Sequence, residues 1–285
     1  MSAAADLPAA PTRWRIFARG KGAIAGAAIL AVLLLLALAG TVVAPFDPDK
    51  VGAGAAMATP GGMHWMGTDE LGRDVFSRIL IGIKVSLLVG LGAAAVSTGL
   101  GVVVGGVAGF SGGLVDDALM RITEVFQVTP RFFLAVLLVA FFGASIVNII
   151  AAIAILSWPE VARIVRAEFL SLRSRQFVDA ARVAGASVGT LIFVEILPNA
   201  LGPVVVNATL QVGQAMLLEA GLSYLGLGDP SQISLGLMLH QAQQIMRAAW
   251  WTTAFPGAMI FLAVLSLNLV GDGLNDVLNP RSRGR

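Results

Sequence analysis

The stretch QFVDAARVAGASVGTLIFVEILP, residues 176–198, decides how this chain is organised, because it is a polar insert between two apolar runs of membrane-crossing length. Arginines flank it, and the pattern predicts a short surface helix rather than a span. Gly185 can adopt the left-handed conformation that ends such a helix. One face carries apolar or small side chains suited to a protein partner: Phe177, Val178, Ala181 and Val183. The same pattern is also typical of an ordinary amphipathic connection between two spans.

The rest of the chain is strongly apolar. Over 285 residues it is 57% hydrophobic and 13% charged, with a mean hydropathy of +0.84, whereas soluble globular proteins are about 25% charged. Five runs without charge exceed the roughly 20 residues that cross about 30 Å of hydrocarbon: 23–44, 85–115, 132–159, 196–218 and 248–271. We therefore expect an all-α, polytopic membrane protein.

The first apolar run follows basic residues, as the apolar region of a secretory signal peptide does. With 22 uninterrupted residues it is longer than the roughly 7–15 residues of that region, so we expect a retained first helix. The chain contains no cysteine, which excludes a disulfide framework and a thiolate metal site.

Two further patterns concern packing. The motif at 64–78 predicts a capped amphipathic helix at the water–lipid interface, with Thr68 or Asp69 as its cap, and by itself this helix implies no chemistry. Gly101, Gly105 and Gly109 have the GxxxG spacing that lets two helix backbones approach closely in lipid. No GxxxxGK[ST] motif occurs, so another polypeptide must bind ATP if ATP is used.

Charges inside spans cost on the order of 2.5–3.5 kcal/mol each and are functional candidates by default. Glu124 and Arg131 are seven residues apart, which would place them on nearly one helix face, either lining a pathway or contacting another subunit. Glu160 and Arg163, three residues apart, predict a local pair or side chains that snorkel to the membrane interface. His64 and His240 are far apart in the sequence and do not indicate a metal site.

Four blocks, in order across nearly the whole chain, resemble the permeases of ATP-binding-cassette (ABC) importers. The stretch with Asp179-Ala180-Ala181, Gly185 and Leu197-Pro198 resembles their EAA loop, although Asp179 stands where the wider motif has Glu. The other three blocks are similar to the dipeptide/oligopeptide/nickel-type subfamily, specifically its C-type permease subunit: GTDELGRDVFSRILIGIKVSLLVG (67–90), EAGLSYLGLG (219–228) and NLVGDGLNDVLNPR (268–281).

The resemblance implies the six-helix fold of type I importer permeases. The third apolar run and its neighbourhood then split into helices near 119–142 and 145–165, with a turn at 143–145 between them. With six spans, both termini lie on one side. The side that carries the 166–198 loop has 13 cations, the other side has 5, and Arg131 lies in a span. The positive-inside rule therefore places both termini and the loop in the cytoplasm of a bacterial plasma (inner) membrane.

The expected organisation of the chain follows from these spans. Its parts are a cytoplasmic tail (1–22), a first transmembrane helix (23–44), an external segment with an interfacial helix (45–82), a five-helix permease core (83–275) that includes the coupling loop (166–198), and a cytoplasmic tail (276–285). The net charge of +2 reflects the loop asymmetry, and nothing in it indicates nucleic-acid binding.

The function implied by the resemblance is a permease subunit of an ATP-driven, binding-protein-dependent importer for peptides or similar small solutes, and not an enzyme. Its partners would be a homologous second permease, two ABC ATPase subunits that hold ATP and Mg, an external solute-binding protein and the lipid bilayer. The chain itself would bind no cofactor and no metal. The implied ATPase-coupling residues are Asp179, Ala180, Ala181, Gly185, Leu197 and Pro198, and the candidates for the translocation path or gate are Glu124, Arg131 and Glu219.

Alternatives remain at this point. Nickel, glutathione, oligosaccharide and opine importers share this permease type, and residues 229–233 lack the Pro-rich, Trp-containing stretch of peptide permeases. An ion-gradient-driven secondary transporter or channel would use Glu124, Arg131 and Glu219 as coupling charges, although no inverted repeat is detectable. A membrane hydrolase is excluded by the lack of HExxH, of a cysteine nucleophile and of a plausible Ser/His/Asp set.

Overall fold

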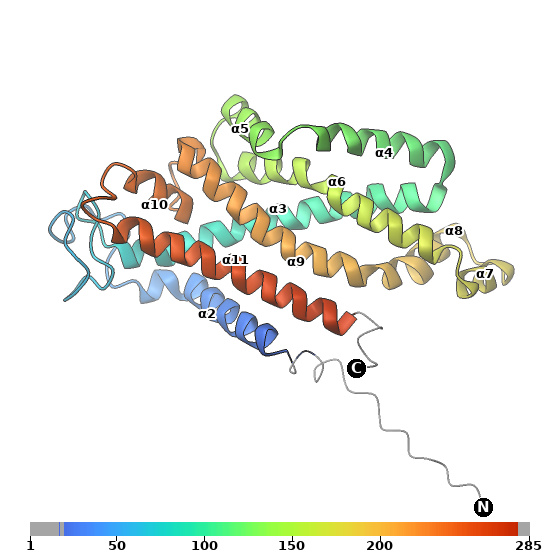
Figure 1. Cartoon of the computed structure of the whole chain (residues 1–285), viewed down its shortest axis with the longest axis horizontal. Coiled ribbons are helices and arrows are strands. Elements are labelled where there is room, and N and C mark those ends of the chain that lie inside the picture. Colours follow the sequence, from blue (N-terminus) through green and yellow to red (C-terminus); the bar gives the residue numbers. More distant parts are fainter. Residues whose placement is uncertain (1–16, 18–19, 279–285) are drawn as a thin grey trace, which may run out of the picture.

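A computed structural model describes residue 17 and residues 20–278, and about three quarters of this part is helical. The expected tails at 1–16 and 279–285, and residues 18–19, lie outside it. Figure 1 shows the elements: α2 (Lys21–Val43), α3 (Val75–Ser111), α4 (Gly113–Val128), α5 (Arg131–Phe142), α6 (Ile146–Leu172), α7 (Gln176–Val183), α8 (Val188–Thr190), the π-helical η1 (Leu191–Ile196), α9 (Leu197–Leu222), the π-helical η2 (Ser223–Leu227), α10 (Leu235–Ala242) and α11 (Trp251–Leu278).

The number of spans agrees with the sequence. Within the described residues, 5 helices are long and apolar enough to cross a membrane, and there are 6 if the bent pair α4 and α5 counts as one span. The expected turn at 143–145 is confirmed, because α5 ends at Phe142 and α6 begins at Ile146. The chain is therefore an all-α, multi-pass membrane protein.

The third span differs from the expected single helix over 119–142. It begins earlier, at Gly113, and it breaks after Val128 with a bend of 85° between α4 and α5. Pro130 causes the break: it has no N–H to continue the helix, and it drives the residue before it into extended backbone. Thr129 accordingly has φ −91° and ψ 138°.

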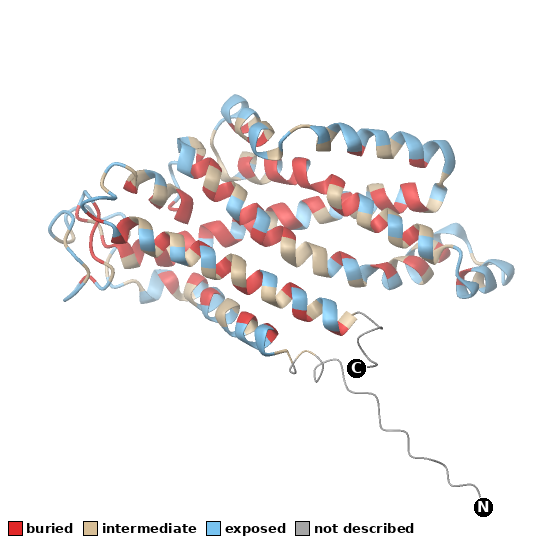
Figure 2. Ribbon diagram, viewed as in Figure 1, coloured by how far each residue is buried: buried red, intermediate tan, exposed pale blue. Residues whose placement is uncertain are grey.

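The core lies along α3, which is buried over much of its length together with the facing sides of α6 and α9 (Figure 2). With 37 residues, α3 is about 55 Å long. Close packing of the GxxxG glycines is confirmed: a Cβ atom at Gly105 would collide with the Ala162 carbonyl oxygen, and one at Gly109 would lie 2.6 Å from Phe169 Cβ. The helices α3 and α6 touch here through backbone because no side chain separates them.

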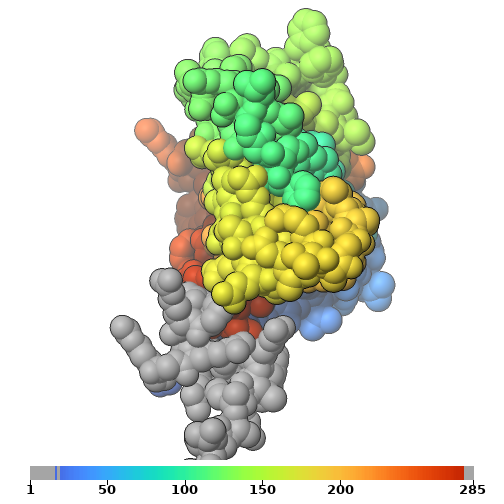
Figure 3. Space-filling model, turned by 90° about the vertical axis from the view of Figure 1, so that its right-hand side faces the viewer, coloured from blue at the N-terminus to red at the C-terminus, as the bar shows by residue number. Residues whose placement is uncertain are grey.

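The two ends of the molecule are built differently. At one end, called the α7 end, α7 projects beyond the start of α2 and the end of α11, which both point toward this end (Figure 1). In the view onto this end, residues coloured yellow form the surface nearest the viewer (Figure 3). At the opposite end, called the cap end, residues 44–74, the cap segment, lie with α10. The cap segment and α7 are therefore separated by the length of the bundle.

The amphipathic helix expected at 64–78 is wrong. Residues 64–74 form turns, and the helix that follows is the start of α3, capped by Asp74, whose carboxylate accepts from the Ser77 N–H at 2.8 Å. Gly67 (φ 73°) and Gly72 (φ 70°) are left-handed and interrupt any helix there. Asp69 does not cap α3 but closes a turn by accepting from the Leu71 N–H.

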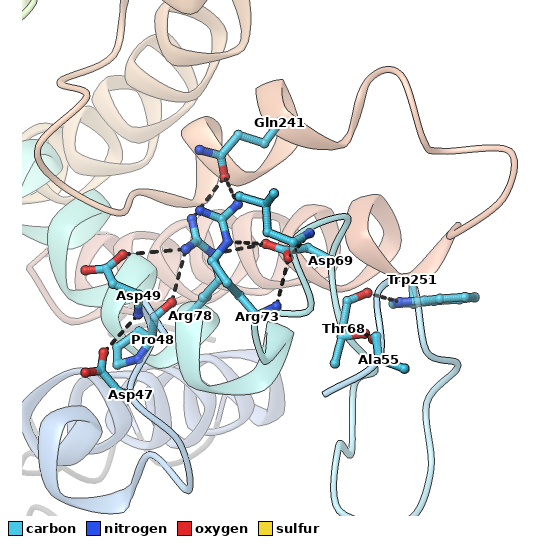
Figure 4. Close-up of polar contacts among 11 residues, drawn as sticks. Asp47, Pro48, Asp49, Ala55, Thr68, Asp69, Arg73, Arg78, Gln241 and Trp251 are labelled. Carbon is cyan, nitrogen blue, oxygen red and sulfur yellow. Dashed lines mark hydrogen bonds and ion pairs between the residues drawn. The ribbon is translucent and has the colours of Figure 1, made fainter. Parts of the chain in front are cut away.

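Arg78 fastens the cap segment to the helices (Figure 4). Its side chain is buried, and it donates to the Pro48 carbonyl oxygen at 3.1 Å and to Gln241 Oε1 of α10 at 3.0 Å. Arg73 donates to the same amide oxygen at 3.3 Å and pairs with Asp69 at 2.6 Å. These bonds join the cap segment, α3 and α10 into one unit.

Arg78→Leu should loosen this unit. The substitution leaves the Pro48 carbonyl without this donor and the Gln241 oxygen with one donor instead of two, at a cost of about 1–3 kcal/mol. We expect faster protease cleavage within residues 44–74 of the detergent-purified protein, read by mass spectrometry of the fragments. Glu70→Gln, at an exposed position of the same segment, is the control and should be cleaved like the wild type. Equal cleavage of all three proteins would contradict the fastening role.

Candidate functional site

The expected short surface helix is confirmed as α7, and one buried side chain anchors it. Val178 is fully buried in a cluster with Phe169 of α6, Leu191 of η1 and Ala200 of α9, and Ala181 packs against the edge of this cluster. An eight-residue helix is marginal on its own. The position of α7 is therefore set by α6 and α9, and α7 should follow their movement.

Gly185 ends α7 in the way expected from the sequence. Its φ is 84°, and two backbone bonds close the helix: the Ala186 N–H donates to the Ala181 carbonyl and the Gly185 N–H to the Arg182 carbonyl. This is the Schellman arrangement, whose left-handed position favours glycine. A side chain at Gly185 would meet no other group within 4 Å, so the demand for glycine here is one of backbone conformation.

The outer face of α7 is open. The residues that form it, called here the α7 surface, are Phe177, Ala180, Val183 and Ala184, all exposed, with Val183 at 90%. Asp179 lies beside them and pairs with Arg182 at 2.9 Å, both side chains being more than half exposed. This ion pair contributes little to stability. The face therefore combines small and apolar side chains with two exposed charges, Asp179 and Arg182, that can pair with another protein instead.

Leu197 and Pro198 do not belong to this surface. They begin α9, directly after η1, where Leu197 packs beside the cluster that holds Val178 and Pro198 is exposed. Of the six residues expected to act in coupling, the structure thus places Asp179, Ala180, Ala181 and Gly185 on or at the end of α7, and the other two at the base of the helix behind it.

Charged groups behind α7 tie it to the rest of the bundle. Arg166 of α6 donates two hydrogen bonds to the buried Asp116 of α4, from Nε to Oδ1 and from Nη2 to Oδ2, the second at 2.7 Å. Arg173, the residue that ends α6, donates to the carbonyl oxygens of Gly109 and Phe110 at 3.1 and 3.2 Å. We call these contacts the arginine clamp. It joins the last turns of α3 and α6 to the first turn of α4, and cations suit those carbonyls at the end of α3.

Sequence reasoning missed this clamp because no local signal marks it. Asp116 and Arg166 are 50 residues apart, and no helical or strand spacing relates them. The one nearby hint is the pair Gly112-Gly113, both left-handed, with φ 67° and 56°, which turns the chain sharply from α3 into α4.

The expected common face of Glu124 and Arg131 is wrong. The break at Pro130 puts them on two helices: Glu124 pairs with Arg121 at 3.0 Å on an exposed face of α4, whereas Arg131 pairs with Glu160 of α6 at 2.8 Å. The local pair expected between Glu160 and Arg163 is therefore also wrong, because Glu160 pairs with Arg131 of α5 instead. Exposure leaves the Arg121–Glu124 pair accessible to another subunit or to a passing solute.

Glu219 is buried rather than exposed to a path, with 2% of its surface accessible. Its carboxylate accepts from the hydroxyl groups of Ser223 at 2.7 Å and Ser86 of α3 at 3.1 Å. Beyond it, the bend expected from the glycines is confirmed, because Gly226 is left-handed within η2. Glu219 therefore belongs to the junction of α9, α3 and α10.

The two histidines have structural partners. His64 Nδ1 lies 2.9 Å from the carboxylate of Asp74, and His240 Nδ1 lies 2.9 Å from the Tyr224 carbonyl oxygen. In the part of the chain that the structure describes, no group of three or more histidine, aspartate or glutamate residues could hold a metal ion.

Comparison with known proteins identifies the family. Residues 101–284 match the model of the binding-protein-dependent transport system inner membrane component, and residues 12–60 match the N-terminal TM domain of oligopeptide transport permease C. The chain is 38% identical over 275 residues to the di/tripeptide transport system permease protein DppC of Pseudomonas aeruginosa (strain UCBPP-PA14), covering 94% of this chain and 91% of that protein.

Two other relatives are similarly close. A putative peptide permease protein of Brucella suis is 39% identical over 269 residues, which cover 93% of this chain and 89% of the relative. The dipeptide transport system permease protein DppC of Bacillus subtilis is 38% identical over 272 residues, covering 95% and 85%. The chain belongs to the family of binding-protein-dependent transport system inner membrane components, and it is a permease subunit of an ABC importer rather than an enzyme.

Proposed function

We propose that this chain is the C-type permease of a peptide importer and that it couples to an ATPase through the α7 surface. The observation that carries the proposal is a short helix, fixed to α6 and α9 by Val178, whose exposed face is small and apolar. Relatives named for dipeptide and di/tripeptide transport support short peptides as the solute. The membrane-spanning domain of this chain then forms the solute path with a homologous second permease.

The remaining partners are proposed from the sequence and the family. Because the sequence carries no phosphate-binding motif, we assign ATP and Mg to two ABC ATPase subunits. The family's dependence on a binding protein supports an external protein that delivers the solute. The excess of cations on the loops of the α7 end supports a cytoplasmic position for that end in a bacterial inner membrane. Both termini are then cytoplasmic, in line with the start of α2 and the end of α11, which point toward the α7 end (Figure 1).

Movement passes from the ATPase into the bundle through rigid contacts. When ATP closes the ATPase pair, α7 is displaced, and α6 moves with it because Val178 and Phe169 pack in one cluster. The arginine clamp extends the displacement to the α3–α4 corner through Arg166 and Arg173. Alternation between inward-open and outward-open forms requires two packings of similar free energy, biased by nucleotide, and no bond chemistry in this chain.

The three charges singled out from the sequence have different places in this scheme. Glu124, exposed with Arg121 on α4, is our candidate for the surface of the path or of the second permease. Arg131 fixes α5 to α6 through Glu160 and acts as a support for the path. Glu219 belongs to the gate at the cap end, which is external in this orientation.

Ala180→Trp should test the docking surface directly. Ala180 is exposed at the centre of the α7 surface, so an indole there fills the space that a partner needs without disturbing the fold. We expect uptake of a radiolabelled dipeptide to fall at least about tenfold, which corresponds to the loss of about 1.4 kcal/mol of coupling free energy. Ala180→Ser keeps the small side chain and should transport like the wild type.

The partners are identified in the same preparations. The tagged chain, extracted in mild detergent, should carry a homologous permease and ATPase subunits, and Ala180→Trp should lose the ATPases while keeping the permease. Wild-type uptake by Ala180→Trp would show that α7 does not couple. Purification of the wild-type chain without any ATPase would instead contradict the importer itself.

A further inference from the structure

We propose that Glu219 is a positioning residue that holds the short helix α10 in place at the cap end, so that its carboxylate acts on transport through α10 and not by touching the solute. The inference deepens the proposed function, on which it rests. It assigns to one buried acid the task of keeping the external gate closed.

The surroundings of Glu219 are unusual for a buried acid. Its side chain is 2% exposed, and the groups that face it are hydroxyls: Ser86 and Ser223, each 1% exposed, and Ser234, 5% exposed. Within the described residues no cation forms an ion pair with it. Burying a carboxyl group without a cation costs free energy of folding. Other contacts of Glu219 must therefore offset this cost.

The compensation comes from the start of α10. Ser86 donates to Glu219 Oε2 at 3.1 Å and at the same time its Oγ accepts the N–H of Leu235, the first residue of α10, at 3.3 Å. Ser234 caps the same helix by accepting the Leu237 N–H at 3.1 Å, and it lines a small cavity together with Glu219. The carboxylate thus reaches the N-terminus of α10 through Ser86, whose hydroxyl binds both Glu219 and the Leu235 N–H.

The N-terminal turn of α10 packs closely against the end of α9. A Cβ atom at Gly236 would lie 2.7 Å from Ala220 Cα and 2.8 Å from Ser223 Cβ. Such contacts depend on the alignment of α10 with the last turns of α9. A small displacement of α10 would therefore break the Ser86–Leu235 hydrogen bond. The same displacement would move the N-terminus of α10 away from Glu219.

A π-helical turn and a non-helical segment precede α10. The π-helical η2 contains Gly226 with φ 85°, and residues 228–234 after it are not helical. π-Helical turns are frequently found at functional sites. At its other end, α10 is tied by Gln241 to Arg78 and Arg73, and by His240 to the Tyr224 carbonyl oxygen of η2. The helix is thus held at one end by the cap segment and η2 and at the other by Ser86 and Glu219, and the non-helical segment before it is where the second contact can open.

These contacts give α10 two states, docked and released. Glu219 favours the docked state, in which α9, α3 and α10 form one closed corner at the cap end. Glu219→Gln keeps the size but replaces one of the two accepting oxygens with an NH2 group, so the hydrogen bond from Ser86 or the one from Ser223 is lost. Ser86→Ala removes the bridge to Leu235 without introducing bulk. Both changes should favour the released state and open the cap end.

Spin-label distances measure the two states in the complete transporter in lipid nanodiscs. The chain has no cysteine, so Gln244→Cys, exposed just after α10, and Leu201→Cys, exposed near the start of α9, form a clean label pair. Without nucleotide, Glu219→Gln and Ser86→Ala should each raise the population of the released distance about tenfold, as expected when one charge-assisted hydrogen bond is lost. Ser97→Ala, a buried hydroxyl of the same helix that bonds only to Ala94, should leave the distances unchanged.

ATPase activity separates a gate from a merely structural contact. With α10 released, ATP hydrolysis should proceed without the binding protein, and uptake of dialanine per ATP should fall for Glu219→Gln and Ser86→Ala but not for Ser97→Ala. Unchanged distances in both variants, with normal wild-type uptake, would overturn this inference alone. Absence of ATP-driven uptake by the wild-type complex would overturn the proposed function instead. If Glu219→Gln fails to assemble, Ser86→Ala decides.

Discussion

Gly105→Leu should prevent the chain from reaching a stable fold. Any side chain at this position meets the Ala162 carbonyl oxygen of α6, which is backbone and cannot turn aside. The helices α3 and α6 would have to separate along the contact that Gly101 and Gly109 also make. Overpacking of a side chain costs about 1–3 kcal/mol, and the loss of a backbone contact in lipid adds to it. We therefore expect little or no monodisperse protein.

Gly99→Leu is the matched control for this prediction. Gly99 lies on the same helix, six residues away, and is exposed, and a Cβ atom there would have no heavy atom within 4 Å. The measurement is size-exclusion chromatography of a fluorescent fusion, followed by thermal unfolding of the monodisperse fraction. Equal yield and equal melting temperature for Gly105→Leu and Gly99→Leu would show that the close contact of α3 and α6 does not limit the fold.

Arg166→Ala should yield an assembled transporter that hydrolyses ATP but imports little. The substitution leaves the buried Asp116 without its partner, and stranding one member of a buried pair costs about 3 kcal/mol. The first turn of α4 is then released from α6, while Val178 still holds α7. We expect the ratio of dipeptide imported to ATP hydrolysed to fall at least about tenfold in proteoliposomes.

A double-mutant cycle separates coupling from stability. Asp116→Ala combined with Arg166→Ala removes the stranded charge, so the melting temperature should recover relative to Arg166→Ala while the import ratio stays low. Asp117→Ala, at the exposed neighbouring position, should change neither quantity. If the double variant regained the import ratio, the Asp116–Arg166 contact would not transmit movement. Its only role would then be to neutralise the buried charge of Asp116.

The helices and their joints could largely be predicted from the sequence, because lipid makes local signals strong. Charge-free runs located the spans, and Gly143 and Gly185 located the turn before α6 and the end of α7. These features depend on residues close to one another in the chain. The helix expected at 64–78 failed for a local reason too, because the left-handed Gly67 and Gly72 outweighed a suitable apolar spacing.

The polar contacts of the site could not be predicted in this way. The pair of Arg131 with Glu160 joins positions 29 residues apart, and that of Arg78 with Gln241 joins positions 163 apart. Such partners depend on which helices are neighbours in the bundle. Apolar spans of similar composition do not indicate which helices will be neighbours. The surroundings of Glu219 show the same limit, since Ser86, which bonds to it, is 133 residues away in the sequence.

The length of α3 sets how far the cap segment stands from the lipid. A helix of 37 residues is about 55 Å long, and even with a tilt of about 40° it rises about 42 Å, against roughly 30 Å of hydrocarbon. Arg78 and Lys84 lie in its first turns, whereas residues 85–111 carry no charge, which places the excess of about 12 Å at the cap end. The cap segment thus stands clear of the lipid headgroups, where a water-soluble partner can reach it.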